Sequence, residues 1–129
     1  MRRTRVALGW QFDTDTTLIR VLAQNAKAFP DRVAMREKSK GIWKETSWRE
    51  LLESVLCCAA GLETLSFRPG DAILVLGDNR PRLYAGMLAV GALGGYAMPA
   101  FADARLDELG HFVDEAEVRF ALAEEQEQV

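Results

Sequence analysis

Residues 72–123 alternate between short apolar runs and helical patterns, and this alternation limits the possible folds more than any other feature of the sequence. Strands are expected at 72–76, 96–100 and 118–123, and helices at 81–94 and 105–116. When strands and helices alternate in this way, the strands form a parallel sheet joined by right-handed helical crossovers. The sequence therefore predicts an α/β fold with a parallel three-stranded βαβαβ layer.

The residues before this layer predict first a helix, over 17–29. Thr16 or Thr17 is expected to cap its N-terminus, and Pro30 to stop it. One face of this helix is apolar, which is typical of a helix that packs one side on a core. The residues of that face are Leu18, Val21, Leu22, Ala26 and Phe29.

A β-hairpin is expected next. Two strand-like runs, 33–38 and 42–48, flank a short turn that contains Gly41. Ser47 and Glu50 then have the spacing of a capping box, in which each residue satisfies a backbone N–H group of the other. The hairpin should therefore lead directly into a second helix.

The second helix is expected to run to about Phe67 with an apolar stripe along one side. The stripe consists of Leu51, Val55, Cys58, Leu62 and Leu65, widened by Leu52, Leu56 and Ala59. On this pattern Cys58 faces the core and Cys57 lies off the stripe. Adjacent helical side chains diverge, so no disulfide is expected between these two cysteines, and a reducing, cytoplasmic location fits best.

The helix expected at 81–94 has no polar face after Arg82, because small and large apolar residues fill every side of it. A helix that is apolar all round must be covered on all sides. Three strands and two helices provide little material for that. The sequence therefore indicates one part of a larger domain.

Length and charge exclude several classes of protein. The 129 residues suffice for one domain with a core. The formal net charge of −3 gives no electrostatic reason to expect nucleic acid or an anionic membrane as partner. Residues 1–16 lack the apolar core of a secretory signal, so a mobile tail is expected there, and no apolar run is long enough to span a membrane.

The strand–turn–helix unit at 74–95 raises the question of a phosphate site, because a helix N-terminus after a strand often holds a phosphate. Gly86 and Gly91 have the spacing of phosphate-loop glycines, but no Lys-Ser/Thr pair follows them. The Asp78 carboxylate would repel a phosphate. Asp78 or Asn79 is better interpreted as the N-cap and Pro81 as a first-turn proline, so a scaffold role is expected.

The single histidine offers one possible metal site. His111 lies one helical turn from Asp107 and one from Glu115, a spacing that two or three ligands of a divalent cation can have. A solvated polar face produces the same pattern, and no third soft ligand is evident. We therefore expect no metal site here.

Several stretches together resemble the N-terminal part of acyl-adenylate-forming enzymes, in particular the bacterial long-chain fatty acid–CoA ligases. They are "NAKAFPDRVAMREKSKGIWKETSW", "FRPGDAILVLGDNRPRLYAGMLAVGALGG" and "EVRFALAEEQEQV", in the family's order and spacing. The resemblance covers residues 17–129 and implies that they are a partial N-terminal subdomain of an AMP-binding enzyme domain.

The resemblance implies an activity for the parent enzyme. A fatty acid carboxylate attacks the α-phosphate of ATP, giving acyl-AMP and pyrophosphate, and the CoA thiol then displaces AMP, with Mg²⁺ screening the phosphates. The family's phosphate loop and catalytic residues follow the region that residue 129 matches, so this chain alone is expected to be inactive and to bind none of these cofactors. Phe101, Ala102 and Asp103 match a loop near the pantetheine arm of CoA, although Asp103 also suits the N-cap of helix 105–116.

Three interpretations stay open. The chain is either a fragment that requires the remainder of the enzyme, or a non-catalytic assembly module that associates through the open edge of the strand at 118–123. A further alternative is an independent flavodoxin-like domain that binds a small ligand at the carboxyl ends of the strands.

Overall fold

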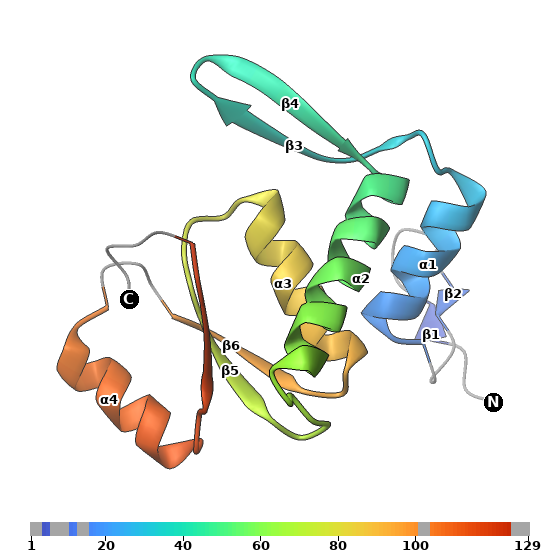
Figure 1. Ribbon diagram of the computed structural model, residues 1–129. Helices are drawn as coiled ribbons and strands as arrows, with labels where there is room; N and C mark the ends of the chain where they lie inside the picture. Colours follow the sequence, from blue (N-terminus) through green and yellow to red (C-terminus); the bar gives the residue numbers. More distant parts are fainter. Residues whose placement is uncertain (1–3, 6–10, 13–15, 101–103, 125–129) are drawn as a thin grey trace.

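The computed structural model describes residues 4–5, 11–12, 16–100 and 104–124 (Figure 1). The expected α/β architecture is confirmed, with a hairpin and helices preceding a parallel sheet. The elements in chain order are β1 (Thr4–Arg5), β2 (Gln11–Phe12), α1 (Leu18–Ala28), β3 (Val33–Ser39), β4 (Ile42–Ser47), α2 (Trp48–Thr64), β5 (Ala72–Leu76), α3 (Pro81–Ala92), β6 (Tyr96–Ala100), α4 (Leu106–Glu115) and β7 (Phe120–Ala123).

Within the expected N-terminal tail, the structure describes one short antiparallel pair. Thr4 of β1 lies opposite Phe12 of β2, and Arg5 lies opposite Gln11. The other residues of 1–15 lie outside the described part of the chain. The mobility of this segment therefore stays a prediction.

The first helix has the predicted cap, because the Thr17 side chain accepts a hydrogen bond of 3.3 Å from the backbone N–H of Arg20. Leu22 and Ala26 are buried as expected. The expectation was wrong for the ends of the stripe, since Leu18 is 77% exposed and Phe29 is 44% exposed. Both lie at the ends of α1, outside the core cluster that Leu22 joins.

The second helix begins at the predicted capping box but ends three residues early. Leu65 is its C-cap, and Ser66 adopts a φ of 64°, which turns the chain away from the helix axis. Phe67 is therefore not the helix end, and its buried ring packs at 5.1 Å from the ring of Phe120. Leu65 and Leu56, expected on the apolar stripe, are exposed instead.

The parallel sheet has the strand order β6-β5-β7, with β5 in the centre. In register, Leu74 lies between Met98 and Ala121, and Val75 lies between Pro99 and Leu122. The strand expected at 118–123 begins only at Phe120, because Glu117 takes a φ of 48° as the chain leaves α4.

The helix α3 joins the sheet to the helical layer, and Figure 1 shows it between the sheet and α2. Ala85 and Ala89 pack with α2 and α1, while Leu83 and Val90 pack with β5 and β7. The all-round burial expected for this helix holds on these two sides only, since Tyr84 is 40% exposed. None of the described helices has the length and hydropathy that a membrane crossing requires.

Candidate functional site

The carboxyl ends of the parallel strands are the first place to look for a ligand site, because doubly wound sheets bind ligands there. The chain leaves β5 through residues 77–80, leaves β6 through residues 101–103, and leaves β7 at Glu124. Phe101, Ala102 and Asp103, predicted as neighbours of the CoA arm, lie outside the described residues. Their expected role is not tested by the structure.

Glu124, directly after β7, lies against the β5–α3 turn. Its Oε2 atom accepts a hydrogen bond of 2.8 Å from the backbone N–H of Asp78, and its Oε1 atom lies 3.3 Å from Nε of Arg80. The Glu124 backbone N–H donates to the carbonyl oxygen of Leu76 at 3.0 Å. The Glu124 side chain is only 14% exposed, whereas the side chains of Asp78 and Arg80 are 64% and 50% exposed, so these contacts lie at the rim of the sheet and are partly open to water.

The start of α3 offers few free donors to an anion. Pro81 has no backbone N–H, and the N–H groups of Leu83 and Tyr84 both point to the carbonyl oxygen of Arg80, at 3.0 and 3.3 Å. The Asp78 N–H is taken by Glu124. Two carboxylates and these occupied donors do not favour a triphosphate at this turn.

The expected N-cap was wrong. Arg80 holds the N-cap position of α3 and makes no side-chain capping bond. The Asp78 carboxylate pairs with Nη2 of Arg80 at 3.3 Å, and the Asn79 amide oxygen accepts from the Tyr84 hydroxyl at 3.4 Å. Asp78 does not cap the helix because its carboxylate pairs with the Arg80 guanidinium. Asn79 does not cap it because its amide oxygen accepts from the Tyr84 hydroxyl. Pro81 does stand in the first turn, as predicted.

A groove of about 870 Å³ lies beside this turn, bounded by the hairpin, α2, α3 and β7. Apolar side chains that include Leu51, Ala85 and Leu122 line part of it. Lys44 and Arg82 add positive charge to its wall. Acidic residues of the hairpin and α2 add negative charge. The groove is therefore mixed in character and carries no concentrated charge of one sign.

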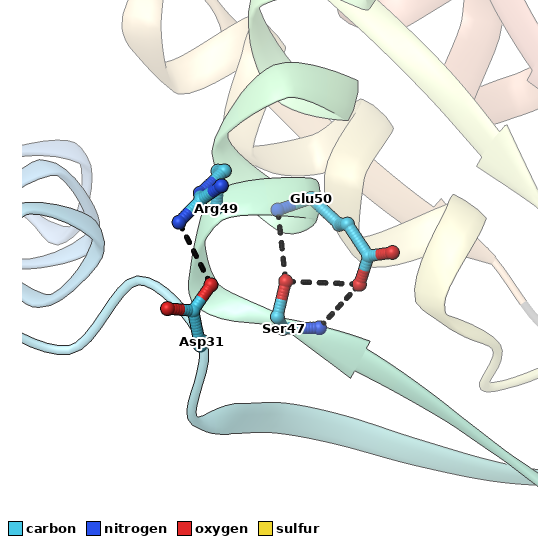
Figure 2. Close-up of polar contacts among 4 residues, drawn as sticks. All are labelled: Asp31, Ser47, Arg49 and Glu50. Carbon is cyan, nitrogen blue, oxygen red and sulfur yellow. Dashed lines mark hydrogen bonds and ion pairs between the residues drawn. The ribbon is translucent and has the colours of Figure 1, made fainter.

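A polar junction fixes the hairpin against α2 (Figure 2). The Ser47 backbone N–H donates to Glu50 Oε2 at 2.7 Å, and the Glu50 N–H donates to the Ser47 hydroxyl at 3.3 Å, which confirms the predicted capping box. Beside it, Arg49 pairs with Asp31 at 2.7 Å. The hydrogen bonds from Ser47 lower the pKa of Glu50 below its ordinary value of 4.5. This junction sets the direction of the hairpin.

The side chains around His111, where the sequence offered a possible cation site but none was expected, come together only in part. His111 Nε2 lies 3.6 Å from Glu115 Oε2, and both side chains are exposed. Asp107 instead accepts from Nε of Arg105 at 3.1 Å. No group of three His, Cys, Asp or Glu side chains suited to a metal occurs in the described part of the chain.

The comparison with protein families decides the identity of the chain. The family model for "AMP-binding enzyme" matches residues 22–129, which is most of the sequence. The chain belongs to the AMP-binding enzyme family. Its match and its fold correspond to the N-terminal segment of adenylate-forming enzymes. An independent flavodoxin-like domain is therefore set aside.

Two mycobacterial proteins are similar to this AMP-binding chain over part of their length. Phenyloxazoline synthase MbtB of a Mycobacterium species is 32% identical over 77 residues, which is 60% of this chain and 7% of that protein. The Mycobacterium tuberculosis protein Rv1549 is 29% identical over 113 residues, 86% of this chain and 62% of that one. The chain thus spans less than two thirds of these relatives.

Solved structures share the fold at low sequence identity. The Klebsiella oxytoca NpsA N-terminal subdomain aligns with a TM-score of 0.75 and 24% identity, over 84% of this chain and 27% of that one. The fatty acid AMP ligase of Legionella pneumophila aligns with a TM-score of 0.77 and 22% identity, over 83% of this chain and 19% of that one. Most of each neighbouring fold therefore has no counterpart in this AMP-binding chain.

The sequence alone indicated no individual role for Glu124. Its partner Asp78 lies 46 residues earlier, and only the pairing of β5 with β7 brings the two together. One available signal was the position of Glu124 directly after a predicted parallel strand, where side chains of the family's sheet meet at one edge.

Proposed function

We propose that this chain forms the first part of the large domain of a fatty acid–CoA ligase, with long-chain fatty acids as the substrate class. Family membership supports an enzyme that forms acyl-adenylates. The long-chain group is supported by "REKSKGIWKETSW", "GDNRPRLY" and "EEQEQV", which stand in that group's order. The parent enzyme would use ATP, Mg²⁺ and CoA in a cytoplasmic location, consistent with two free cysteines, Cys57 and Cys58.

In this proposal the described residues contribute structure and no catalytic group. The observation that carries this part is the closure of the β5–α3 turn by Glu124, which leaves no cradle for a triphosphate there. An adenylate-forming site needs donors aimed at phosphate oxygens and a cation near the attacked phosphorus. Those groups belong to the remainder of the enzyme. Phe101, Ala102 and Asp103 are the residues of this chain that we place near the CoA arm.

The first experiment measures exchange of labelled pyrophosphate into ATP by the 129-residue chain, with palmitate as the acid. We expect no exchange above the background without protein. The Legionella pneumophila fatty acid AMP ligase serves as the positive control for adenylate formation. Acid-dependent exchange by the chain alone would overturn the scaffold role.

The second experiment reads the coding sequence after codon 129. An open frame with a Thr/Ser/Gly-rich loop ending in lysine would identify the remainder of the enzyme. The extended protein should then give exchange with long-chain acids and form a thioester when CoA is added. Exchange with aryl acids or amino acids only would contradict the fatty acid assignment and leave the adenylate-forming assignment intact.

A second candidate function is supported by the exposed side of α3 and by the edge of the sheet. Among the described residues, β7 pairs with β5 alone, so its other edge is open to another strand. A non-catalytic module that self-associates through this edge would sediment as a dimer. Ala121→Pro in β7 should then give a monomer, whereas a wild-type monomer at all concentrations would exclude this alternative.

A further inference from the structure

The tip of the β3–β4 hairpin exposes two large apolar side chains side by side in sequence. Ile42 is 68% exposed and Trp43 is 63% exposed. Figure 1 shows the hairpin projecting beyond the helices, with its turn far from α1. Successive side chains of a strand point to opposite faces, so Ile42 and Trp43 lie on the two faces of the hairpin and can meet one partner together only at its end.

The hairpin carries a charge opposite to that of the rest of the chain. Residues 33–47 contain four basic and two acidic side chains, a net charge of +2, whereas the whole chain has a net charge of −3. Arg36 and Glu45 neutralise each other at 2.9 Å. Lys38, Lys40 and Lys44 remain around the apolar tip. The acidic residues near them are Glu37, opposite Lys44 in the strand register, and Asp78, which lines the same hollow as Lys38 and Lys40. The overall negative charge thus hides a local basic end.

The turn itself contains a lysine in a conformation that lysine rarely adopts. Lys40 has a φ of 49° and Gly41 a φ of 80°. Two-residue hairpin turns with positive φ at both positions strongly favour Asn-Gly, because a longer side chain is strained there. A lysine held in this place keeps a positive charge at the outermost point of the hairpin.

We propose that the hairpin tip docks on the surface of an anionic phospholipid bilayer. Trp43 and Ile42 enter the interfacial region, and the lysine ammonium groups contact lipid phosphates. Tryptophan favours this region because its ring is apolar and its N–H stays hydrated, and lysine places its charged end at the headgroups while its stem covers apolar surface. Lys38 Nζ lies 6.0 Å from the centroid of the Trp43 ring, and the two residues are opposite each other in the strand register, so cation and ring share one face of the hairpin.

A bilayer fits this tip better than a folded protein partner. Basic residues around an exposed tryptophan match the charge and the polarity gradient of an anionic interface. The tip is narrow, with one tryptophan and one isoleucine, whereas a specific protein interface buries a broad patch. This docking is peripheral, and it stands independently of the proposed enzymatic function.

The test is co-sedimentation of the 129-residue chain with vesicles of phosphatidylcholine alone or mixed with phosphatidylserine. We expect binding to the anionic vesicles that weakens when salt rises from about 0.1 M to about 1 M, which shortens the screening length from about 10 Å to about 3 Å. The double variant Ile42→Ser/Trp43→Ser should lose this binding. Equal binding to neutral vesicles, or no binding to either, would overturn the proposal.

Lys40→Asn separates docking from folding. Asparagine suits the positive φ, so the variant should melt at the same or a higher temperature. It should nevertheless bind anionic vesicles about fivefold more weakly, the contribution of one basic residue near such a surface. Unchanged binding by Lys40→Asn would contradict the role of the turn lysine.

Matched controls exclude nonspecific effects. Leu65→Ser removes an apolar side chain that is 65% exposed at the far end of α2, and Lys27→Asn removes a basic side chain from the last turn of α1. Both should leave vesicle binding unchanged. If the wild-type chain instead forms a dimer that Ile42→Ser/Trp43→Ser dissolves, the tip is a protein interface and the bilayer proposal is wrong.

Discussion

The Glu124 carboxylate accepts a hydrogen bond from the backbone N–H of Asp78 at 2.8 Å, across 46 residues of sequence. The same carboxylate reaches Arg80, so one side chain at the end of β7 holds the turn that precedes α3. Gly77 permits this approach, because a Cβ atom there would lie 2.8 Å from the Glu124 Cβ atom. The carboxyl end of β5 is therefore covered by a residue from the end of β7.

Removing the Glu124 carboxylate should destabilise the fold. Glu124→Ala removes the acceptor of the Asp78 N–H at the exposed rim of the sheet, so we expect the free energy of unfolding to fall by about 0.5–1.5 kcal/mol. Glu124→Gln keeps an amide oxygen for that bond and should cost less. Urea unfolding measures both, with the exposed Glu53→Gln as control. Equal losses for Ala and Gln would show that the acceptor does not matter.

Two glycines should respond to alanine in opposite directions. At Gly95, a Cβ atom would press on the ring of Phe67 and lie 2.8 Å from the carbonyl oxygen of Asp71, so Gly95→Ala should cost about 1–3 kcal/mol. At Gly91, within α3, nothing lies within 4 Å of such an atom. Gly91→Ala should therefore stabilise by about 0.5–1 kcal/mol through helix propensity. Thermal melts distinguish the two, and a stable Gly95→Ala would mean that Phe67 moves freely.

The capping box should make stability depend on pH in the acid range. The folded-state pKa of Glu50 lies below its ordinary value of 4.5, so the unfolded chain takes up a proton first as the pH falls. The contribution of this carboxylate is thus complete above the unfolded pKa and is lost as the pH falls through the folded pKa. Glu50→Gln should be less stable than the wild type at neutral pH, and the difference should shrink below about pH 4.

The matching control for the capping box is Ser47→Ala. Removing an N-cap hydroxyl typically costs about 1 kcal/mol. Because Ser47 supplies the hydrogen bonds that lower the Glu50 pKa, Ser47→Ala should also flatten the acid limb of the stability profile. If the free energy of unfolding falls with acid pH as steeply in both variants as in the wild type, the pH dependence comes from other carboxyl groups.

The elements that depend on local sequence were predicted well. The boundaries of β5 and β6 match the structure, as do the Thr17 cap and the Ser47–Glu50 box, because each follows from residues a few positions apart. The helix ends were less predictable. The end of α2 depends on the positive φ of Ser66, and no glycine marks that position.

The site was harder to predict than the fold, because it depends on residues far apart in sequence. The contacts of Glu124 with Asp78 and Arg80 follow from the β5–β7 register. The basic character of the hairpin tip was also hidden, since the net charge of the whole chain averages it with the acidic helices α2 and α4. Family resemblance identified the enzyme class but carried no catalytic residue onto the described part of the chain.

The contact between α2 and α3 gives the last prediction. Ala89 has no exposed surface and packs in one cluster with Val55 and Leu51 of α2, so the two helices approach closely at this small side chain. Ala89→Leu would force the helices apart and should lower the free energy of unfolding by about 1–3 kcal/mol. Ala60→Leu, on the exposed side of α2, changes the same atoms and should stay within about 0.5 kcal/mol of the wild type. If both variants unfold at the wild-type denaturant concentration, α3 is not packed against α2 in solution. The helical layer would then lack the contact that joins it to the sheet.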